Sequence, residues 1–327
     1  MTQTTNAESI GRIVDAIRTR HRFVISSHAR PDGDSIGSQL AMAGALKALG
    51  KEVLVVNKDA APPPLMAFPH VPEIEIADSV DGSFDAAIIM ECGDLARTGV
   101  LGLERFFTIN IDHHPDNTSY GQINWFDPTA AACGEMVYEL IRALGLALSR
   151  DMATHIYLAI LTDTGSFRYS SISLRTFDIC RETVVAGVEP VAIARTVYES
   201  SSLGRLRLYG GLLNSMQLDP TGRIAVLYVD HDITRAAGGT YEDTEGLINI
   251  PLSVKEIEAV IFFRKIEDDV YRVSMRSKAK VDISAVAKVF EGGGHKNASG
   301  CTAHGAIDEL QREFVTRVGQ AIDAGRN

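Results

Sequence analysis

The sequence has few cysteines and no long apolar run, and both shortages exclude classes of protein. Its four cysteines, Cys92, Cys133, Cys180 and Cys301, are widely scattered and form no CxxC pair, so they indicate neither a disulfide framework nor a zinc knuckle. Apolar runs such as VLVV and AAIIM are too short to span a bilayer, and the N-terminus has no apolar segment of signal-peptide length. We therefore expect a cytoplasmic protein with no membrane partner.

An excess of positive charge is also missing. The 327 residues carry a formal net charge of −10 at pH 7, whereas a protein that coats long nucleic acid needs an extended basic surface. We therefore expect no long nucleic acid as a stable partner. The segment 260–300 is locally basic, so a short anionic ligand and an ordinary solvated face both stay open there.

The apolar pattern predicts an α/β fold, because the chain is long for a single core and alternates strand and helix signals. In the first half this pattern indicates a doubly wound, mainly parallel sheet. Strands are expected at 22–27, 51–57, 84–91 and 105–112, and helices at 36–49, where Gly50 is the expected C-terminal cap, 134–144 and 152–162. Further strands are expected at 222–230, 258–265 and 270–278, and a helix at 282–290. We predict a first domain over residues 1–187, a helical linker over 188–216 and a smaller α/β domain over 217–327.

The first polar cluster, His28, Asp32 and Asp34, lies directly after a predicted strand and before a predicted helix. Ligands bind at this edge of an open parallel sheet, where strand ends and helix N-termini meet. One imidazole and two carboxylates suit one or two divalent cations. The alternative is structural: Asp34 as a helix N-cap, and Asp32 as a turn residue after Pro31.

The second cluster is the run Asp112, His113 and His114, which ends an apolar strand. Burying three such side chains without partners is costly, so a ligand site is favoured over a chance polar loop. Glu91 also ends an apolar run and is well placed to bridge two cations, whereas Asp94 is better explained as a turn cap or a partner of Arg97.

Two further sites complete the set. Asp163 follows the apolar segment 155–161 and either binds a metal or caps the next turn. Farther along, three glycines precede His295 and allow the backbone to approach an anion closely, although a flexible turn is the alternative. Arg276 lies on a predicted strand, on the face opposite to Tyr271, Val273 and Met275, and is placed to contact the same anion.

With these motifs in this order, the chain resembles the DHH phosphoesterases. That family is named for the triplet that is Asp112-His113-His114 in this sequence. The segment His28–Ser35 resembles the first motif of that family, and Leu161–Arg168 resembles its fourth motif. The segment Gly292–Gly300 resembles the GGGH signature of the DHH-associated domain. Within the family, the length and the second domain resemble the bifunctional oligoribonuclease and PAP phosphatase group.

The resemblance implies a catalytic first domain and a substrate-binding second domain. Members of that group degrade very short RNA to mononucleotides and remove the 3′-phosphate of adenosine 3′,5′-bisphosphate (pAp), usually with manganese. It therefore implies short RNA and pAp as substrates and two Mn²⁺ ions, with Mg²⁺ or Co²⁺ as alternatives. A cyclic- or linear-dinucleotide phosphodiesterase, and a nucleotide-binding sensor with a weakened metal site, stay open as alternatives. A monomer and a homodimer are both open.

The resemblance also implies a role for each residue. His28 and Asp32 would hold one cation, and Asp34, His113 and Asp163 the other. The family usually has Asp at the position that bridges the two ions, whereas this chain has Glu91, which is one methylene longer. His114 would lie near the scissile phosphate, with Asp112 ordering the histidines. The implied substrate-binding residues are Arg276, Ser277, Gly292, Gly293, Gly294 and His295.

Overall fold

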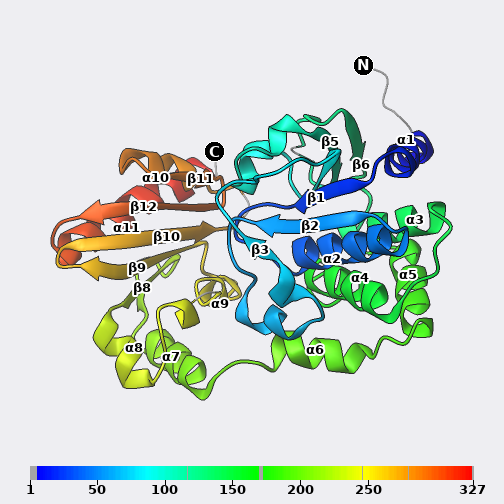
Figure 1. Cartoon of the computed structure of the whole chain (residues 1–327). Helices are drawn as coiled ribbons and strands as arrows, with labels where there is room; N and C mark the ends of the chain where they lie inside the picture. The colour runs from blue at the N-terminus through cyan, green and yellow to red at the C-terminus, as the bar shows by residue number, and fades with distance from the viewer. Residues whose placement is uncertain (1–5, 116, 169–171, 245, 279, 326–327) are drawn as a thin grey trace. The chain divides into compact units, whose positions relative to one another are not determined.

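The computed structural model describes residues 6–115, 117–168, 172–244, 246–278 and 280–325, without the side chain of His295. The chain divides between Ser200 and Ser201 into two compact units, each with its own six-stranded sheet (Figure 1). Within the described ranges, no helix is long and apolar enough to cross a membrane. The predicted α/β class, with a parallel sheet in the first unit, is confirmed.

All six strands of the first sheet are parallel and follow the order β3-β2-β1-β4-β5-β6. The strands are β1 (Arg22–Ser26), β2 (Glu52–Asn57), β3 (Glu75–Ile76), β4 (Ala86–Met90), β5 (Phe107–Asp112) and β6 (Ile123–Phe126). The order reverses between β1 and β4, and in sheets of this kind ligands bind at the carboxyl ends of the strands at such a point. The clusters at His28, Glu91 and Asp112 follow or end β1, β4 and β5, so this topology brings them to one edge.

Both faces of this sheet are buried, because successive side chains of a strand point to opposite faces. Phe23 and Ile25 pack with the helices, whereas Val24 packs with Leu103 and other residues of the short segments between β4 and β5. Figure 1 shows α2, α3, α4 and α5 together on one side of this unit. The helices are α1 (Asn6–Thr19), α2 (Gly33–Ala48), α3 (Cys133–Ala143), α4 (Arg150–Asp163), α5 (Leu174–Val185) and α6 (Pro190–Tyr198), and the 3-10 turns are η1 (Pro63–Ala67), η2 (Val71–Glu73), η3 (Leu95–Thr98) and η4 (Leu103–Arg105).

Helices α2 and α4 pack closely, and this contact positions two carboxylates of the candidate site. A Cβ on Gly37 would lie 2.4 Å from the carbonyl oxygen of His155, so only glycine permits this approach. Asp34 lies in the first turn of α2 and Asp163 is the last residue of α4. Gly50 follows α2 with a φ of 73°, as expected for a helix C-terminus.

The second unit is a mixed sheet in the order β11-β12-β10-β9-β8-β7, buried on both faces. Ile261 and Phe263 of β9 belong to the core that includes residues of α10 and α11. Val260 and Phe262 belong to the core on the other face, which includes residues of α7. Its strands are β7 (Gln217–Leu218), β8 (Ile224–Val229), β9 (Ala259–Glu267), β10 (Val270–Ser277), β11 (Gly293–His295) and β12 (Ala298–His304). Its helices are α7 (Leu203–Asn214), α8 (His231–Ala237), α9 (Asn249–Leu252), α10 (Ser284–Val289) and α11 (Ile307–Ala324), with the turn η5 (Glu242–Thr244). The three-part division at residues 187 and 216 stays a prediction, with α6 in the first unit and α7 in the second.

Candidate metal centre

Asp34 is a buried carboxylate held by three donors. Its oxygens accept hydrogen bonds from the backbone N–H of Cys133 at 2.7 Å, from that of Gly134 at 3.1 Å and from the hydroxyl of Ser38 at 2.7 Å. The two amides open α3, where the helix dipole favours negative charge. Burial nevertheless raises the pKa of Asp34, although the charge of His113 opposes that shift. The N-cap of α2 is Asp32, so the alternative interpretation of Asp34 as an N-cap is wrong.

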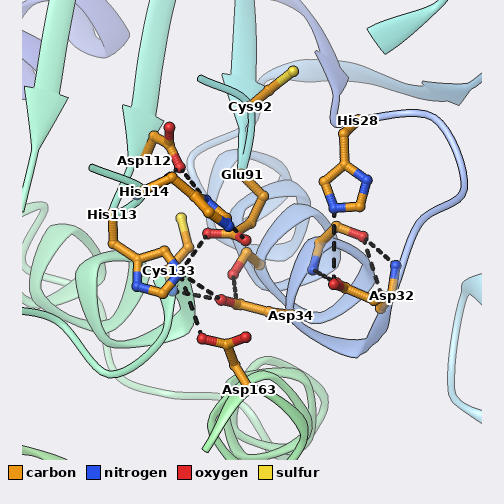
Figure 2. A network of polar contacts seen from close by, with 12 residues as sticks. His28, Asp32, Asp34, Glu91, Cys92, Asp112, His113, His114, Cys133 and Asp163 are labelled. Atoms are coloured by element: carbon orange, nitrogen blue, oxygen red, sulfur yellow. Dashed lines mark hydrogen bonds and ion pairs between the residues drawn. The ribbon is translucent and has the colours of Figure 1, made fainter. Parts of the chain in front are cut away.

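His113 turns one ring nitrogen toward three carboxylates. Its Nδ1 donates to the carbonyl oxygen of Ala130 at 3.0 Å, because a carbonyl can only accept, and this turns Nε2 toward the carboxylates. Nε2 lies 3.4 Å from Oε1 of Glu91, 3.5 Å from Oδ2 of Asp163 and 3.9 Å from Oδ2 of Asp34. Figure 2 shows these side chains pointing toward one another. An imidazole nitrogen and carboxylate oxygens at these separations are arranged as ligands around a shared cation would be.

Glu91 is a buried carboxylate that lies beside both histidines. Its Oε1 has no hydrogen-bond partner within the described part of the chain, and its Oε2 lies 3.8 Å from Nδ1 of His114. Burial, together with the charge of Asp34, raises the pKa of Glu91 well above its ordinary value. The backbone adopts a φ of 56° there, a strained conformation that is common at functional sites. A nearby cation would offset the cost of this buried charge.

Asp112 and His114 form a hydrogen-bonded pair beside this cluster. Oδ1 of Asp112 accepts from Nδ1 of His114 at 2.8 Å, and Oδ2 accepts from the amide of Asn117 at 2.6 Å. Burial disfavours the charged carboxylate, but these two hydrogen bonds outweigh it and hold the pKa of Asp112 below its ordinary value. The same bond to Asp112 raises the pKa of His114 against the effect of burial. Asn117 was not singled out from the sequence, because a lone amide in a polar loop carries no pattern.

His28 and Asp32 form a separate pair on the Asp34 side of the site (Figure 2). Nδ1 of His28 contacts the carbonyl oxygen of Ala29 at 2.9 Å, and its Nε2 lies 3.8 Å from Oδ2 of Asp32. Asp32 also caps α2 by accepting from the N–H of Ser35 at 2.9 Å. Its charge helps to raise the pKa of Asp34, Glu91 and Asp163. The pair thus lies close enough to the cluster to act on it electrostatically.

The donor set fits divalent cations. Two groups have ligand atoms within 4.8 Å of one another: Glu91 with His113 and His114, and Asp34 with His113 and Asp163. Imidazole nitrogens and carboxylate oxygens suit borderline cations such as Mn²⁺. The second group is the one that the family resemblance implies for a single ion, and the first contains the expected bridging residue Glu91. The role of each residue as a ligand, including His28 and Asp32, stays a prediction.

Asp163 is expected to make the stability of the metal-free protein depend on pH. Burial, with the charge of Asp34, raises the pKa of Asp163 from 3.8 to about 6. The folded state then holds this proton more tightly than the unfolded state, so stability falls as pH rises from 3.8 toward 6. In chelator, Asp163→Asn should therefore raise Tm by a few degrees at pH 8 and leave it nearly unchanged at pH 4. Calorimetry that finds equal shifts at both pH values would contradict this.

The second unit carries the other predicted residues. Arg276 lies on the sheet face opposite to Met275, as expected, and its Nη1 donates to the carbonyl oxygen of Met275 at 3.0 Å. Ser277 is buried, and its hydroxyl donates to Val281 O at 2.8 Å and accepts from Asn297 at 2.9 Å, so the fold already uses it. Residues Gly293–His295 form strand β11, paired antiparallel with β12, and the alternative of a turn at this position is wrong. The binding roles of Arg276, Ser277, Gly292, Gly293, Gly294 and His295 stay predictions.

Known protein families match a large part of each unit. The DHH family N-terminal domain matches residues 22–160, and the DHHA1 domain matches residues 221–323. The bifunctional oligoribonuclease and PAP phosphatase NrnA of Thermus thermophilus is 32% identical over 305 residues, covering 90% of each chain. The Bacillus subtilis protein of the same name is 28% identical, over 92% of this chain and 95% of its own.

Solved structures share the fold. An exopolyphosphatase-related protein from Bacteroides fragilis superposes with a TM-score of 0.86 at 27% identity, over 100% of both chains. RecJ from Thermus thermophilus in complex with Mn²⁺ superposes with a TM-score of 0.55 at 15% identity, over 100% of this chain and 55% of RecJ. The chain therefore belongs to the DHH family, with a DHH N-terminal domain followed by a DHHA1 domain.

Proposed function

We propose that the chain is a two-metal phosphoesterase that hydrolyses very short RNA to mononucleotides and removes the 3′-phosphate of pAp. The observation that carries this proposal is His113, whose Nε2 faces Glu91, Asp163 and Asp34 at 3.4, 3.5 and 3.9 Å. The names of the relatives from Thermus thermophilus and Bacillus subtilis supply the substrates. We take Mn²⁺ as the working cation, with Mg²⁺ and Co²⁺ as substitutes.

The residues around His113 would hold the cations. Asp34, His113 and Asp163 would hold one ion and His28 and Asp32 the other, and Glu91 would serve both. Two bound divalent cations supply charge that activates water at neutral pH and that offsets charge developing on the phosphoryl oxygens. Glu91 has a longer side chain than the Asp that is usual in the family, and burial restricts where its carboxylate can lie.

His114 would give a proton to the leaving ribose oxygen. Its Nδ1 is committed to Asp112 at 2.8 Å, so Nε2 is the nitrogen that exchanges a proton with substrate. The hydrogen bond that His114 donates to Asp112 raises the pKa of His114, which increases the fraction of imidazolium near neutral pH. Asp112 holds the ring in the orientation that this transfer needs.

The second unit would bind the substrate end that is not cleaved, through Arg276, Ser277, Gly292, Gly293, Gly294 and His295. His295→Ala is expected to raise KM for pAp by about tenfold, the value of one lost charge-assisted contact of roughly 1.4 kcal/mol, and to change kcat by less than about twofold. Steady-state kinetics on pAp measure this split. An unchanged KM with a reduced kcat would reject the binding role. His304→Ala, an exposed histidine on β12, is the matched control.

A side-by-side assay tests the proposed activity. Release of phosphate or mononucleotide is measured with pAp, RNA dimers and trimers, long RNA, short DNA and pyrophosphate, each with Mn²⁺ and with chelator. The proposal expects turnover of pAp and of dimers or trimers with Mn²⁺ only, and slower turnover of long strands. Binding of pAp without turnover under both conditions would favour a nucleotide sensor, and faster turnover of pyrophosphate would overturn the substrate assignment.

A further inference from the structure

Arg175, the second residue of α5, pairs with three carboxylates outside the candidate metal centre. Its Nη1 lies 2.7 Å from Oδ2 of Asp127, and its Nε lies 2.9 Å from Glu139 and 3.4 Å from Glu135. Asp127 and Glu135 are buried. Its Nη1 donates to Asp127, whereas its Nε has no hydrogen-bond partner within the described residues, so the guanidinium acts on Glu135 and Glu139 through its charge.

Two of these carboxylates lie at the two ends of the segment 128–134. Asp127 directly follows β6, and its N–H donates to the carbonyl oxygen of Asp112 at 3.2 Å. Glu135 lies in the first turn of α3, and its Oε2 accepts from the N–H of Ala131 at 3.2 Å. Because Arg175 contacts both Asp127 and Glu135, it ties the start of the segment to its end.

The backbone of this segment makes direct contacts with two of the proposed metal ligands. The carbonyl oxygen of Ala130 accepts from Nδ1 of His113 at 3.0 Å. The N–H groups of Cys133 and Gly134 donate to Asp34 at 2.7 and 3.1 Å. One short stretch of chain thus sets the orientation of an imidazole and of a carboxylate that belong to the same group of ligand atoms.

The charges of the network explain why an arginine is needed there. Burial raises the pKa of Glu135, and the nearby charge of Asp127 adds to that shift. Burial acts on Asp127 in the same direction, but hydrogen bonds from Thr129 and Arg175 outweigh it and lower the pKa of Asp127. Without the guanidinium, Asp127 and Glu135 would repel each other across the segment that they now hold together.

We propose that Arg175 is a positioning residue of the metal centre, acting through the segment 128–134 on His113 and Asp34. The inference rests on the proposed function. Loss of an outer contact to a metal ligand weakens metal binding by roughly 10- to 100-fold. Arg175 acts one contact farther out, but on two ligands together. We therefore expect its removal to weaken metal binding by about tenfold, the lower end of that range.

Direct binding of Mn²⁺ to the full-length chain tests this. The free ion is followed by its electron paramagnetic resonance signal as protein is titrated, for wild type, Arg175→Met and Arg175→Lys. Arg175→Met removes the charge at similar length. Arg175→Lys keeps the charge but loses the planar guanidinium group. Arg181→Met is the matched control, because Arg181 lies on the same helix, is largely exposed and pairs with its neighbour Glu182 at 2.7 Å. Circular dichroism and Tm give the folded fraction of each variant.

The expected result is a Kd for Mn²⁺ that rises about tenfold in folded Arg175→Met, by a smaller factor in Arg175→Lys, and not at all in Arg181→Met. A purely structural role would lower Tm and leave the Kd of the folded protein unchanged, which would overturn the inference. If Arg175→Met does not fold, Arg175→Lys decides between the same two outcomes. A wild-type chain that binds no Mn²⁺ would overturn the proposed function and this inference with it, whereas wild-type Kd values in both variants overturn this inference alone.

Discussion

His113→Ala is expected to reduce turnover of pAp by more than about 100-fold, beyond the range that lost outer contacts cost a metal site. The reason is that His113 belongs to both groups of ligand atoms, one with Glu91 and His114 and one with Asp34 and Asp163. Removing it deprives one proposed ion of its imidazole ligand and leaves Glu91, Asp34 and Asp163 to repel one another. Initial rates of phosphate release, at saturating Mn²⁺ and over a range of Mn²⁺ concentrations, measure the effect.

The control for His113→Ala is His21→Ala. His21 belongs to the same unit, but its side chain is 63% exposed and lies 3.8 Å from Glu52 at the protein surface. This variant should keep the activity of the wild type. Full activity in His113→Ala would reject the metal assignment, and equal losses in both variants would point to damage of the fold rather than of the site.

Asp112→Asn is expected to lower kcat by roughly 10²- to 10⁴-fold, the range of general acid–base catalysis, with a much smaller change in KM. Asparagine keeps the size of the side chain but carries no charge. It can present an N–H to Nδ1 of His114, so the ring loses both its preferred orientation and the interaction that raises its pKa. Single-turnover kinetics on pAp separate this chemical step from substrate binding.

Asp94→Asn is a suitable comparison for Asp112→Asn. Asp94 caps η3 by accepting from the N–H of Ala96 at 2.8 Å, and asparagine is an equally good cap. We expect its kinetics to match the wild type. An Asp112→Asn variant that retains kcat would show that His114 does not depend on Asp112, and would remove His114 from the proposed proton transfer.

The sequence predicted the strands that carry the site because each contains an uninterrupted apolar run bounded by polar residues. It placed Asp112 at the end of β5, as found, and Glu91 as the last residue of the strand 84–91, whereas β4 ends one residue earlier at Met90. It also explained Asp94 as a turn cap, which the structure confirms. Strands β3 and β7 were missed because each has two residues, and such a length leaves no period to detect.

The contacts that orient the ligands had no sequence signal. Asp34 is held by backbone N–H groups of Cys133 and Gly134, about 100 residues away along the chain, and main-chain donors carry no residue preference. The glycines before His295 form the edge strand β11, paired with β12 on one side, and the sequence did not predict this strand. This pairing is a local hairpin in which Gly293 lies opposite Gly300, and its short glycine-rich strand gives no apolar period to detect.

Binding of Mn²⁺ measured together with phosphate release from pAp tests the central claim most directly. The metal-free chain is brought to increasing Mn²⁺ concentrations by equilibrium dialysis, bound ions are counted, and the rate is recorded at each point. A two-metal centre predicts two bound ions per chain, no release in chelator, and a rate that rises with occupancy of the second ion. Full release of phosphate by a chain that holds no bound cation would contradict the account.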